Sequence, residues 1–212
     1  MNEDPLPRSS LLKIPHQQRA IATVHAILDA GIRVLERDGM AGFNTNRVAE
    51  TAGVSPGSLY QYFSNKEMIV SGIVERGVLG TEQQMREVSM AAADIPPHVL
   101  LRQLCTAILV QLEPYRALLA EILSATPVLS GTGIAAILET RFSDLFRDLM
   151  LVHAERYSVR GGPTGLYVAI NGAIYVVLKW LSERPAFISR EALVDALLVQ
   201  LDVLLVERGP RR

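Results

Sequence analysis

The chain has 212 residues, of which 49% are hydrophobic and 20% charged, and its formal net charge is -1. This composition predicts a folded chain with a sizeable core and excludes an intrinsically disordered one, because enough apolar surface is available to bury. The near-neutral charge gives no general signature of nucleic-acid binding, since the first 76 residues hold eight basic and eight acidic residues. Evidence for a nucleic-acid partner must therefore come from the placement of particular residues.

The only cysteine, Cys105, excludes an intramolecular disulfide, and one thiol does not make a metal site, so we expect no metal and no cofactor. Only Arg102 is a basic neighbour at helical spacing, which favours a buried structural thiol over an oxidation sensor. Residues 1–15 lack the apolar core of a signal peptide. The uncharged run 161–178 is long enough for a membrane span but equally typical of a helix buried in a soluble protein. We expect a cytoplasmic protein without a membrane partner.

In chain order, the pattern predicts helices almost throughout. Residues 1–15 hold three prolines and mixed charges, which favours a flexible arm. An apolar stripe with helical spacing follows from His16 and ends at Gly39, in the position of a C-terminal cap. Short helices are predicted at 44–51 and 56–62, then a longer one at about 65–90. Beyond a boundary at 95–97, further helices are predicted at 97–112, 115–124, 132–157, 164–183 and 189–207. No segment alternates with a strand period, so the predicted fold is all-α.

The stretch 43–63 carries the signals of two short helices joined by a tight turn. Gly53 can adopt the positive φ that ends the first helix, and Ala49 is small enough for a close crossing. Asn44 is a good N-cap for the first helix. Ser55 is a good N-cap for the second, which has proline at its first position. For the next helix, Ser64 and Glu67 are expected to form a capping box.

This pattern, with its long first helix and the segment NTNRVAETAGVSPGSLYQYFSNKEMI, resembles the DNA-binding domain of the TetR family of transcriptional regulators over residues 19–75. The remainder is similar to the family only in length and helical character. The resemblance implies a flexible arm at 1–15, a helix-turn-helix domain at 16–76, and a helical ligand-sensing and dimerisation domain at 77–212. It also implies that the protein is not an enzyme. The expected function is sequence-specific regulation, most often repression, of a palindromic double-stranded DNA operator by a homodimer.

The resemblance also assigns DNA-binding roles to individual residues. It implies that the second short helix enters the major groove, with phosphate contacts from Thr45, Tyr60 and Lys66. Residues near base edges or their flanking phosphates are Asn46, Ser58, Gln61 and Tyr62, while Pro56 and Gly57 begin the recognition helix. Lys66 has independent support, because a lysine in the first turn of a helix opposes the helix dipole unless an anion binds there. Gly57 can offer only close approach of its backbone, so readout must depend on the other side chains and on DNA shape.

The second domain offers less specific signals. Small residues at 165, 169, 172 and 173 let another helix approach helix 164–183, and helix 189–207 is apolar on most sides. Both features fit a dimer interface, although a monomeric core would produce them as well. The candidate ligand-binding residues, for a small apolar effector, are Leu104, Ile108, Phe142, Phe146, Asn171 and Tyr175. A dimer hydrogen bond or an ordered water could equally satisfy Asn171.

Two alternatives to a DNA-binding repressor follow from the sequence. An enzyme with a DNA-binding appendage is disfavoured, because the chain has no metal-ligand spacing, phosphate loop or nucleophile motif, and its four histidines are scattered. A helix-turn-helix regulator that acts through protein partners stays open because the N-terminal charge is neutral. The sequence does not distinguish a repressor from an activator.

Overall fold

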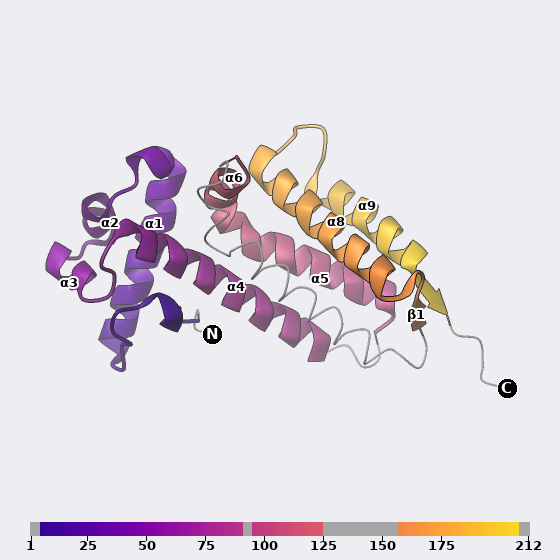
Figure 1. The fold of residues 1–212 in the computed structure, drawn as a ribbon, viewed down its shortest axis with the longest axis horizontal. Helices are drawn as coiled ribbons and strands as arrows, with labels where there is room; N and C mark the ends of the chain where they lie inside the picture. Colours follow the sequence, from indigo (N-terminus) through magenta and orange to yellow (C-terminus); the bar gives the residue numbers. More distant parts are fainter. Residues whose placement is uncertain (1–4, 91–94, 125–156, 208–212) are drawn as a thin grey trace. The chain divides into compact units, whose positions relative to one another are not determined.

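The structure is a computed structural model that describes residues 5–90, 95–124 and 157–207. In chain order, its elements are the 3-10 helix η1 (Arg8–Ser10), α1 (Gln18–Gly42), α2 (Thr45–Ala52), α3 (Pro56–Tyr60), α4 (Lys66–Met90), α5 (Pro97–Leu112), the 3-10 helix η2 (Glu113–Tyr115), α6 (Arg116–Ser124), β1 (Tyr157–Val159), α8 (Gly162–Glu183), α9 (Arg190–Leu204) and β2 (Leu205–Glu207) (Figure 1). The all-α prediction is confirmed for the described part of the chain, apart from one short antiparallel ribbon of β1 and β2.

The chain divides into two compact units. The first comprises residues 1–80 and 114–125, and the second comprises 81–113 and 126–212. The long helix α4 contributes its first part to one unit and its last part to the other. The division differs from the predicted single boundary at residue 76, because α6 belongs with the N-terminal unit. Tyr115 is buried against Gly77 of α4, and Arg116 lies 3.6 Å from the Glu36 carboxylate of α1.

In the first unit, the core lies between α1, the short helices and the start of α4. Its largest fully buried side chains include Ile27 and Leu28 of α1 and Phe63 before α4. The apolar stripe of α1 is interrupted where predicted: Gly39 has φ 61°, and three more residues continue the helix beyond this kink. Helix α1 approaches α4 closely at Gly31, where an added Cβ would lie 2.8 Å from the side chain of Ile73.

Part of the segment that the sequence predicted as a flexible arm, residues 7–15, is attached to the first unit. Ser9 and Ser10 donate hydrogen bonds to the two carboxylate oxygens of Glu75, at 3.0 and 2.7 Å, and Leu12 N–H donates to the Tyr62 carbonyl at 2.9 Å. Pro7 and Pro15 are buried at either end of this stretch. Residues 7–15 are therefore fixed to the first unit by specific hydrogen bonds, which proline content alone does not reveal.

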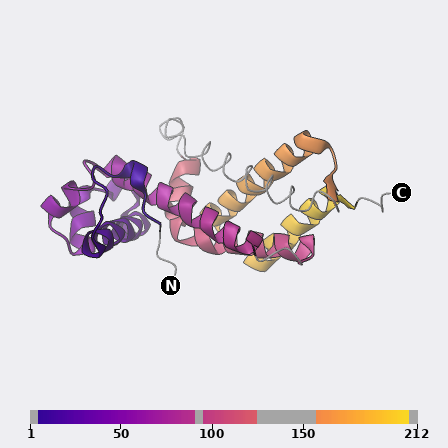
Figure 2. The same cartoon turned by 90° about the horizontal axis from the view of Figure 1, so that it is seen from below.

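In the second unit, α5, α8 and α9 contact one another (Figures 1 and 2). Their core cluster includes Met85 from the last part of α4, Leu100, Leu101 and Leu104 from α5, and Leu201 from α9. Helix α5 has the bounds that the sequence predicted, 97–112. The predicted helix 189–207 instead ends at Leu204, where the chain enters β2, and the predicted helix 132–157 lies largely outside the described residues.

The turn between α8 and α9 is held by one carboxylate. Glu113, at the end of α5, forms ion pairs with Arg184 and, at 3.2 Å, with Arg190. The Arg184 guanidinium stacks over the Trp180 ring, 4.4 Å from its centroid, and the Trp180 indole N–H donates to the Ile188 carbonyl at 3.0 Å. These contacts fix the ends of three helices relative to one another within this unit.

Candidate nucleic-acid interface and ligand pocket

Helices α2 and α3 form a helix-turn-helix, and local interactions explain the conformation of its turn and the start of each helix. Gly53 ends α2 in the left-handed conformation, with φ 68° and ψ 29°. The Asn44 side chain caps α2 by accepting from Arg47 N–H at 3.0 Å. The Ser55 hydroxyl caps α3 by accepting from Ser58 N–H at 3.1 Å, and Pro56 occupies the first helical turn, where a missing N–H costs nothing. Both predicted N-caps are confirmed.

The cap of α4 differs from the prediction. Asn65 Oδ1 accepts from Met68 N–H at 2.8 Å, whereas the Ser64 hydroxyl donates to the Met68 sulfur at 3.0 Å. The predicted capping box of Ser64 and Glu67 is therefore wrong by one residue. Adjacent Ser and Asn both suit an N-cap, so the sequence could not choose between them. The helix begins at Lys66, which places that lysine in its first turn, as expected.

Five of the nine predicted DNA-binding residues are exposed, while Thr45, Ser58 and Lys66 are half-buried. Asn46, Pro56, Gly57 and Gln61 are exposed, and Tyr60 retains 46% of its accessible surface. The hydroxyl groups of Thr45 in α2 and Tyr60 in α3 lie 3.0 Å apart in a hydrogen bond. Two residues from different helices, both expected to contact phosphates, are thus already paired in the free protein.

Two of the residues predicted to contact DNA have structural roles within the unit. Tyr62 is only 8% exposed, so its ring packs in the core of the unit and we leave it out of the proposed interface. The Ser58 hydroxyl is half-buried and hydrogen-bonded to the Ser55 hydroxyl at 2.8 Å, as part of the cap of α3. Gly57 has open space: an added Cβ would meet only the Ser55 hydroxyl, at 3.9 Å.

Charge near the two short helices is sparse. Arg47 is the only basic residue of α2 and α3, and its guanidinium lies 3.2 Å from both the Asp38 carboxylate and the Gly42 carbonyl. A hydrogen bond from Arg37 lowers the pKa of Asp38 and keeps that carboxylate charged. Arg47 is therefore partly neutralised, and a duplex would have to find further cations elsewhere on this unit.

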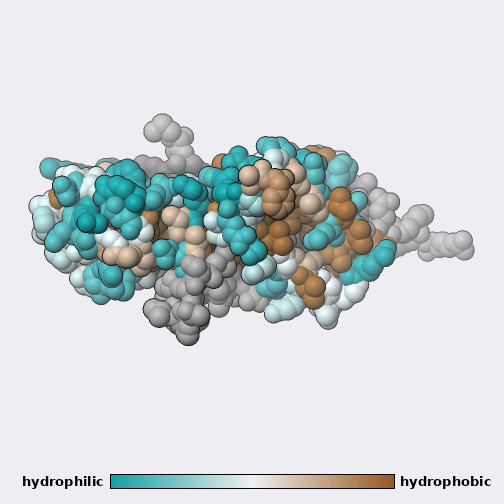
Figure 3. Space-filling view, turned by 90° about the horizontal axis from the view of Figure 1, so that it is seen from above, coloured by the Kyte–Doolittle hydropathy of each residue, from teal (hydrophilic) through white to brown (hydrophobic). Residues whose placement is uncertain are grey.

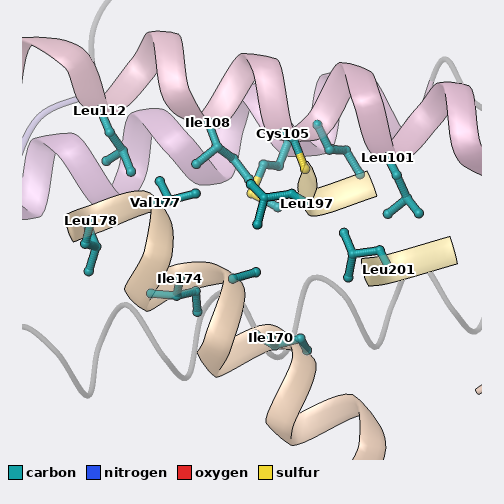
Figure 4. Close-up of a pocket in the computed structure, with 13 residues that line it drawn as sticks. Leu101, Cys105, Ile108, Leu112, Ile170, Ile174, Val177, Leu178, Leu197 and Leu201 are labelled. Carbon is teal, nitrogen blue, oxygen red and sulfur yellow. The ribbon is translucent and has the colours of Figure 1, made fainter. Parts of the chain in front are cut away.

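The second unit contains an apolar pocket between α5, α8 and α9 (Figure 4). Its cavity measures about 100 Å³. Among the described residues, thirteen line it, all of them aliphatic, methionine or cysteine: Met85, Leu101, Leu104, Cys105, Ile108, Leu112, Ile170, Ala173, Ile174, Val177, Leu178, Leu197 and Leu201. No charged side chain and no side-chain nitrogen or oxygen is among these lining residues.

The pocket includes two of the six predicted ligand-binding residues. Leu104 and Ile108 line it, whereas Asn171 and Tyr175 do not, and Phe142 and Phe146 lie outside the described residues. Asn171 donates instead to the Tyr167 carbonyl of its own helix at 2.9 Å, and Tyr175 is 57% exposed. The neighbouring face of α8 lines the pocket. Because α8 is apolar on all sides, its spacing does not indicate which face is buried.

Cys105 lines this pocket, and its environment favours the interpretation as a structural thiol. Burial raises its pKa to about 11, against a smaller lowering by the charge of Arg102. The group is therefore a neutral thiol near pH 7, and a thiol is a weak nucleophile compared with its thiolate. Within the described residues, no cluster of His, Cys, Asp and Glu could hold a metal ion.

The comparisons with known proteins agree with this geometry. Residues 27–73 match the sequence family described as bacterial regulatory proteins, tetR family. BetI, an HTH-type transcriptional regulator of Rhizobium meliloti (strain 1021), is 34% identical over 71 residues, which make up 34% of this chain and 34% of BetI. The match thus spans about a third of the length of this curated relative.

Solved structures extend the similarity of fold over most of the chain. The SmeT–triclosan complex has a TM-score of 0.64 at 22% identity, over 89% of this chain and 93% of SmeT. The fatty acid degradation regulator FadR from Bacillus halodurans has a TM-score of 0.63 at 16% identity, over 89% of this chain and 96% of FadR. Identities this low support the fold alone.

The turn and its caps define a helix-turn-helix, and the residues that form it lie within the match to the tetR family of bacterial regulatory proteins. Residues 27–73 are thus similar to the tetR family, and the fold of the described chain is similar to solved structures described as TetR-family transcriptional regulators. The resemblance inferred from the turn and its caps is thereby confirmed.

Proposed function

We propose that the protein is a cytoplasmic homodimeric repressor that binds a palindromic DNA operator and is released from it by a small apolar effector. The observation that carries DNA binding is the exposed α3 surface, with Pro56, Gly57 and Gln61, beside the paired hydroxyls of Thr45 and Tyr60. Side chains at the exposed start of a recognition helix can reach base edges, while hydroxyls and lysines bind phosphates.

A second copy of the chain is the proposed partner of α8 and α9. Their exposed side chains include Tyr167, Val168, Tyr175 and Val176 on α8 and Val199 and Val203 on α9, each more than 40% accessible. Figure 3 shows hydrophobic side chains on the surface of this unit. By length and composition alone, α8 could cross a membrane, but the core helix of a soluble protein passes the same test. The other face of α8 lines the pocket within the chain. A protein partner would cover the face that the chain leaves exposed.

A palindromic operator follows from a two-fold dimer. The two recognition helices must then lie about one helical turn of DNA apart, ~34–36 Å, or a near multiple. A gel-shift titration with the DNA upstream of the protein's own reading frame tests DNA binding and locates the operator. Specific retardation that competitor DNA does not abolish supports the proposal. Failure to retard this fragment and every duplex in a random-sequence selection would contradict it.

The pocket supports an effector that is uncharged and hydrophobic. The described residues of its lining offer no ion-pair partner, and transfer of a charged group into such a site is strongly unfavourable. SmeT, which shares the fold, has been solved in complex with triclosan. The cavity is smaller than the ~300–1,000 Å³ typical of sites for drug-sized ligands, so a compact molecule fits best.

In one conformation of the dimer, the spacing of the two recognition helices does not match the operator. Release requires that the effector bind this conformation more tightly than the DNA-binding one. Helix α4 contributes residues to both units, including Met85 at the pocket, and is the expected connection. By linkage, operator DNA must weaken effector binding by the same factor that the effector weakens DNA binding. A calorimetric titration of the protein with a hydrophobic phenol, with and without operator, measures this factor, and an effector affinity that operator DNA leaves unchanged would contradict the proposed release.

A further inference from the structure

We propose that the N-terminal segment Pro7–Pro15, here called the strap, is part of the DNA interface and that Lys13 binds a backbone phosphate beside the half-site. This inference rests on the proposed function, since it adds a contact to the same DNA-binding surface. It is carried by the hydrogen bonds that fix the strap and by the exposed residues that follow the last of them.

The strap is attached to the unit at two places. Glu75 of α4 accepts from Ser9 N–H and from the Ser10 hydroxyl, one with each carboxylate oxygen. Leu12 N–H donates to the Tyr62 carbonyl, two residues beyond the end of α3. Consecutive Cα atoms are about 3.8 Å apart, so Lys13 lies beside the turn that joins α3 to α4. That turn carries Gln61 on one side and Lys66 on the other.

The exposed residues of the strap are unusual for a segment so firmly attached. Lys13 is exposed, and its neighbours Leu12 and Ile14 keep 58% and 39% of their accessible surface. Among the residues that the structure describes, Lys13 forms no hydrogen bond or ion pair. A fixed cation flanked by two exposed aliphatic side chains is suited to the edge of a duplex. There, the ammonium can bind a phosphate and the aliphatic groups can contact sugar or a thymine methyl.

The strap also supplies the positive charge that the two short helices lack. Arg47 is partly neutralised by Asp38, so among the basic residues of α2, α3 and the first turn of α4 only Lys66 has a charge without a described ion pair. Phosphate neutralisation provides much of the affinity of protein–DNA complexes. One carboxylate that could oppose this charge, Glu75, instead holds the strap in place.

The test uses the full-length protein and a duplex selected by the wild-type chain from a random-sequence library. Lys13→Gln should lower the slope of log affinity against log salt by about 0.9, so that the ratio of wild-type to variant affinity rises about eightfold for each tenfold fall in salt. Arg86→Gln is the matched control, because it removes the same charge from an exposed site about 30 Å along α4 from Lys66. It should leave the slope unchanged.

A third variant separates a fixed contact from a general charge effect. Ser10→Ala removes one attachment without changing charge. It should weaken DNA binding when Lys13 is present and have little effect in the Lys13→Gln background. Equal slopes for wild type and Lys13→Gln, or equal losses from Lys13→Gln and Arg86→Gln, would overturn the strap proposal while wild-type binding sustains the proposed function. A wild-type protein that binds no duplex would overturn both, and circular dichroism confirms that each variant is folded.

Discussion

The substitution Gly172→Leu separates the stability of one protomer from the stability of the proposed dimer. Gly172 lies in the middle of α8, is exposed, and has no heavy atom within 4 Å of where a Cβ would be added. A leucine therefore fits the isolated chain. The neighbouring residues on the same face, Val168 and Val176, are 64% and 41% exposed, so a second copy packed there would meet the new side chain directly.

The two expected effects have opposite signs. Replacing glycine in a helix interior with leucine should stabilise α8 by about 0.8 kcal/mol, because leucine loses less backbone freedom on folding. Overpacking an interface costs about 1–3 kcal/mol for each insertion. A two-fold axis makes the change twice, which gives roughly 2–6 kcal/mol. The dimer dissociation constant should then rise between about 30-fold and about 20,000-fold, at 1.4 kcal/mol for each factor of ten.

Light scattering over a concentration series measures the dissociation constant, and chemical unfolding of the dilute monomer measures the stability of the protomer. Gln103→Leu adds the same exposed leucine to α5, away from the proposed interface, and should remain dimeric. A Gly172→Leu protein that stays dimeric and binds operator normally would refute the assignment of α8 and α9 to the interface. If the variant loses the dimer and its protomer is also less stable, leucine does not fit the isolated chain as the open space at Gly172 predicts.

Three further predictions concern the interface and the pocket. Lys66→Ala should lower the salt slope of operator binding by about 0.9 for one lost phosphate, measured by fluorescence anisotropy, and an unchanged slope would remove Lys66 from the interface. Gln61→Ala should change the preferred base at one position in each half-site by about 1–3 kcal/mol, measured by binding to a panel of single-base variants; equal losses on specific and random duplexes would contradict base readout. Cys105 should react slowly with iodoacetamide at pH 7. Its rate should rise about tenfold for each pH unit towards its pKa of about 11, as long as the chain stays folded, and a rate that levels off near pH 8 would contradict the buried thiol.

The helix-turn-helix could be predicted because each of its signals is local. Asn44, Gly53 and Ser55 act within three or four residues of themselves, so the chain around them determines their role. The attachment of the strap could not be predicted in this way. Glu75 lies more than 60 residues from Ser9 and Ser10, and nothing in either segment indicates the other.

The pocket shows a different limit. Leu104 and Ile108 were predictable because α5 carries polar residues on its other face, which orients the helix. Helix α8 has no charge before Lys179, so rotation about its axis changes little in apolar burial. Contacts with α5 and α9 determine which face turns inward, and these depend on tertiary packing. The prediction of Asn171 and Tyr175, which do not line the described pocket, follows from that ambiguity.

The hydrogen bond between Thr45 and Tyr60 has a consequence for the entropy of DNA binding. Each hydroxyl carries one hydrogen, so whichever group donates across the 3.0 Å contact, the pair retains one hydrogen to offer outward. Both side chains are already confined to one arrangement when the protein is free. Immobilising a flexible side chain at an interface costs about 0.5–1.5 kcal/mol, and here most of that ordering occurs during folding. In the proposed interface, the tyrosine and threonine act towards a phosphate as one ordered donor that spans two helices.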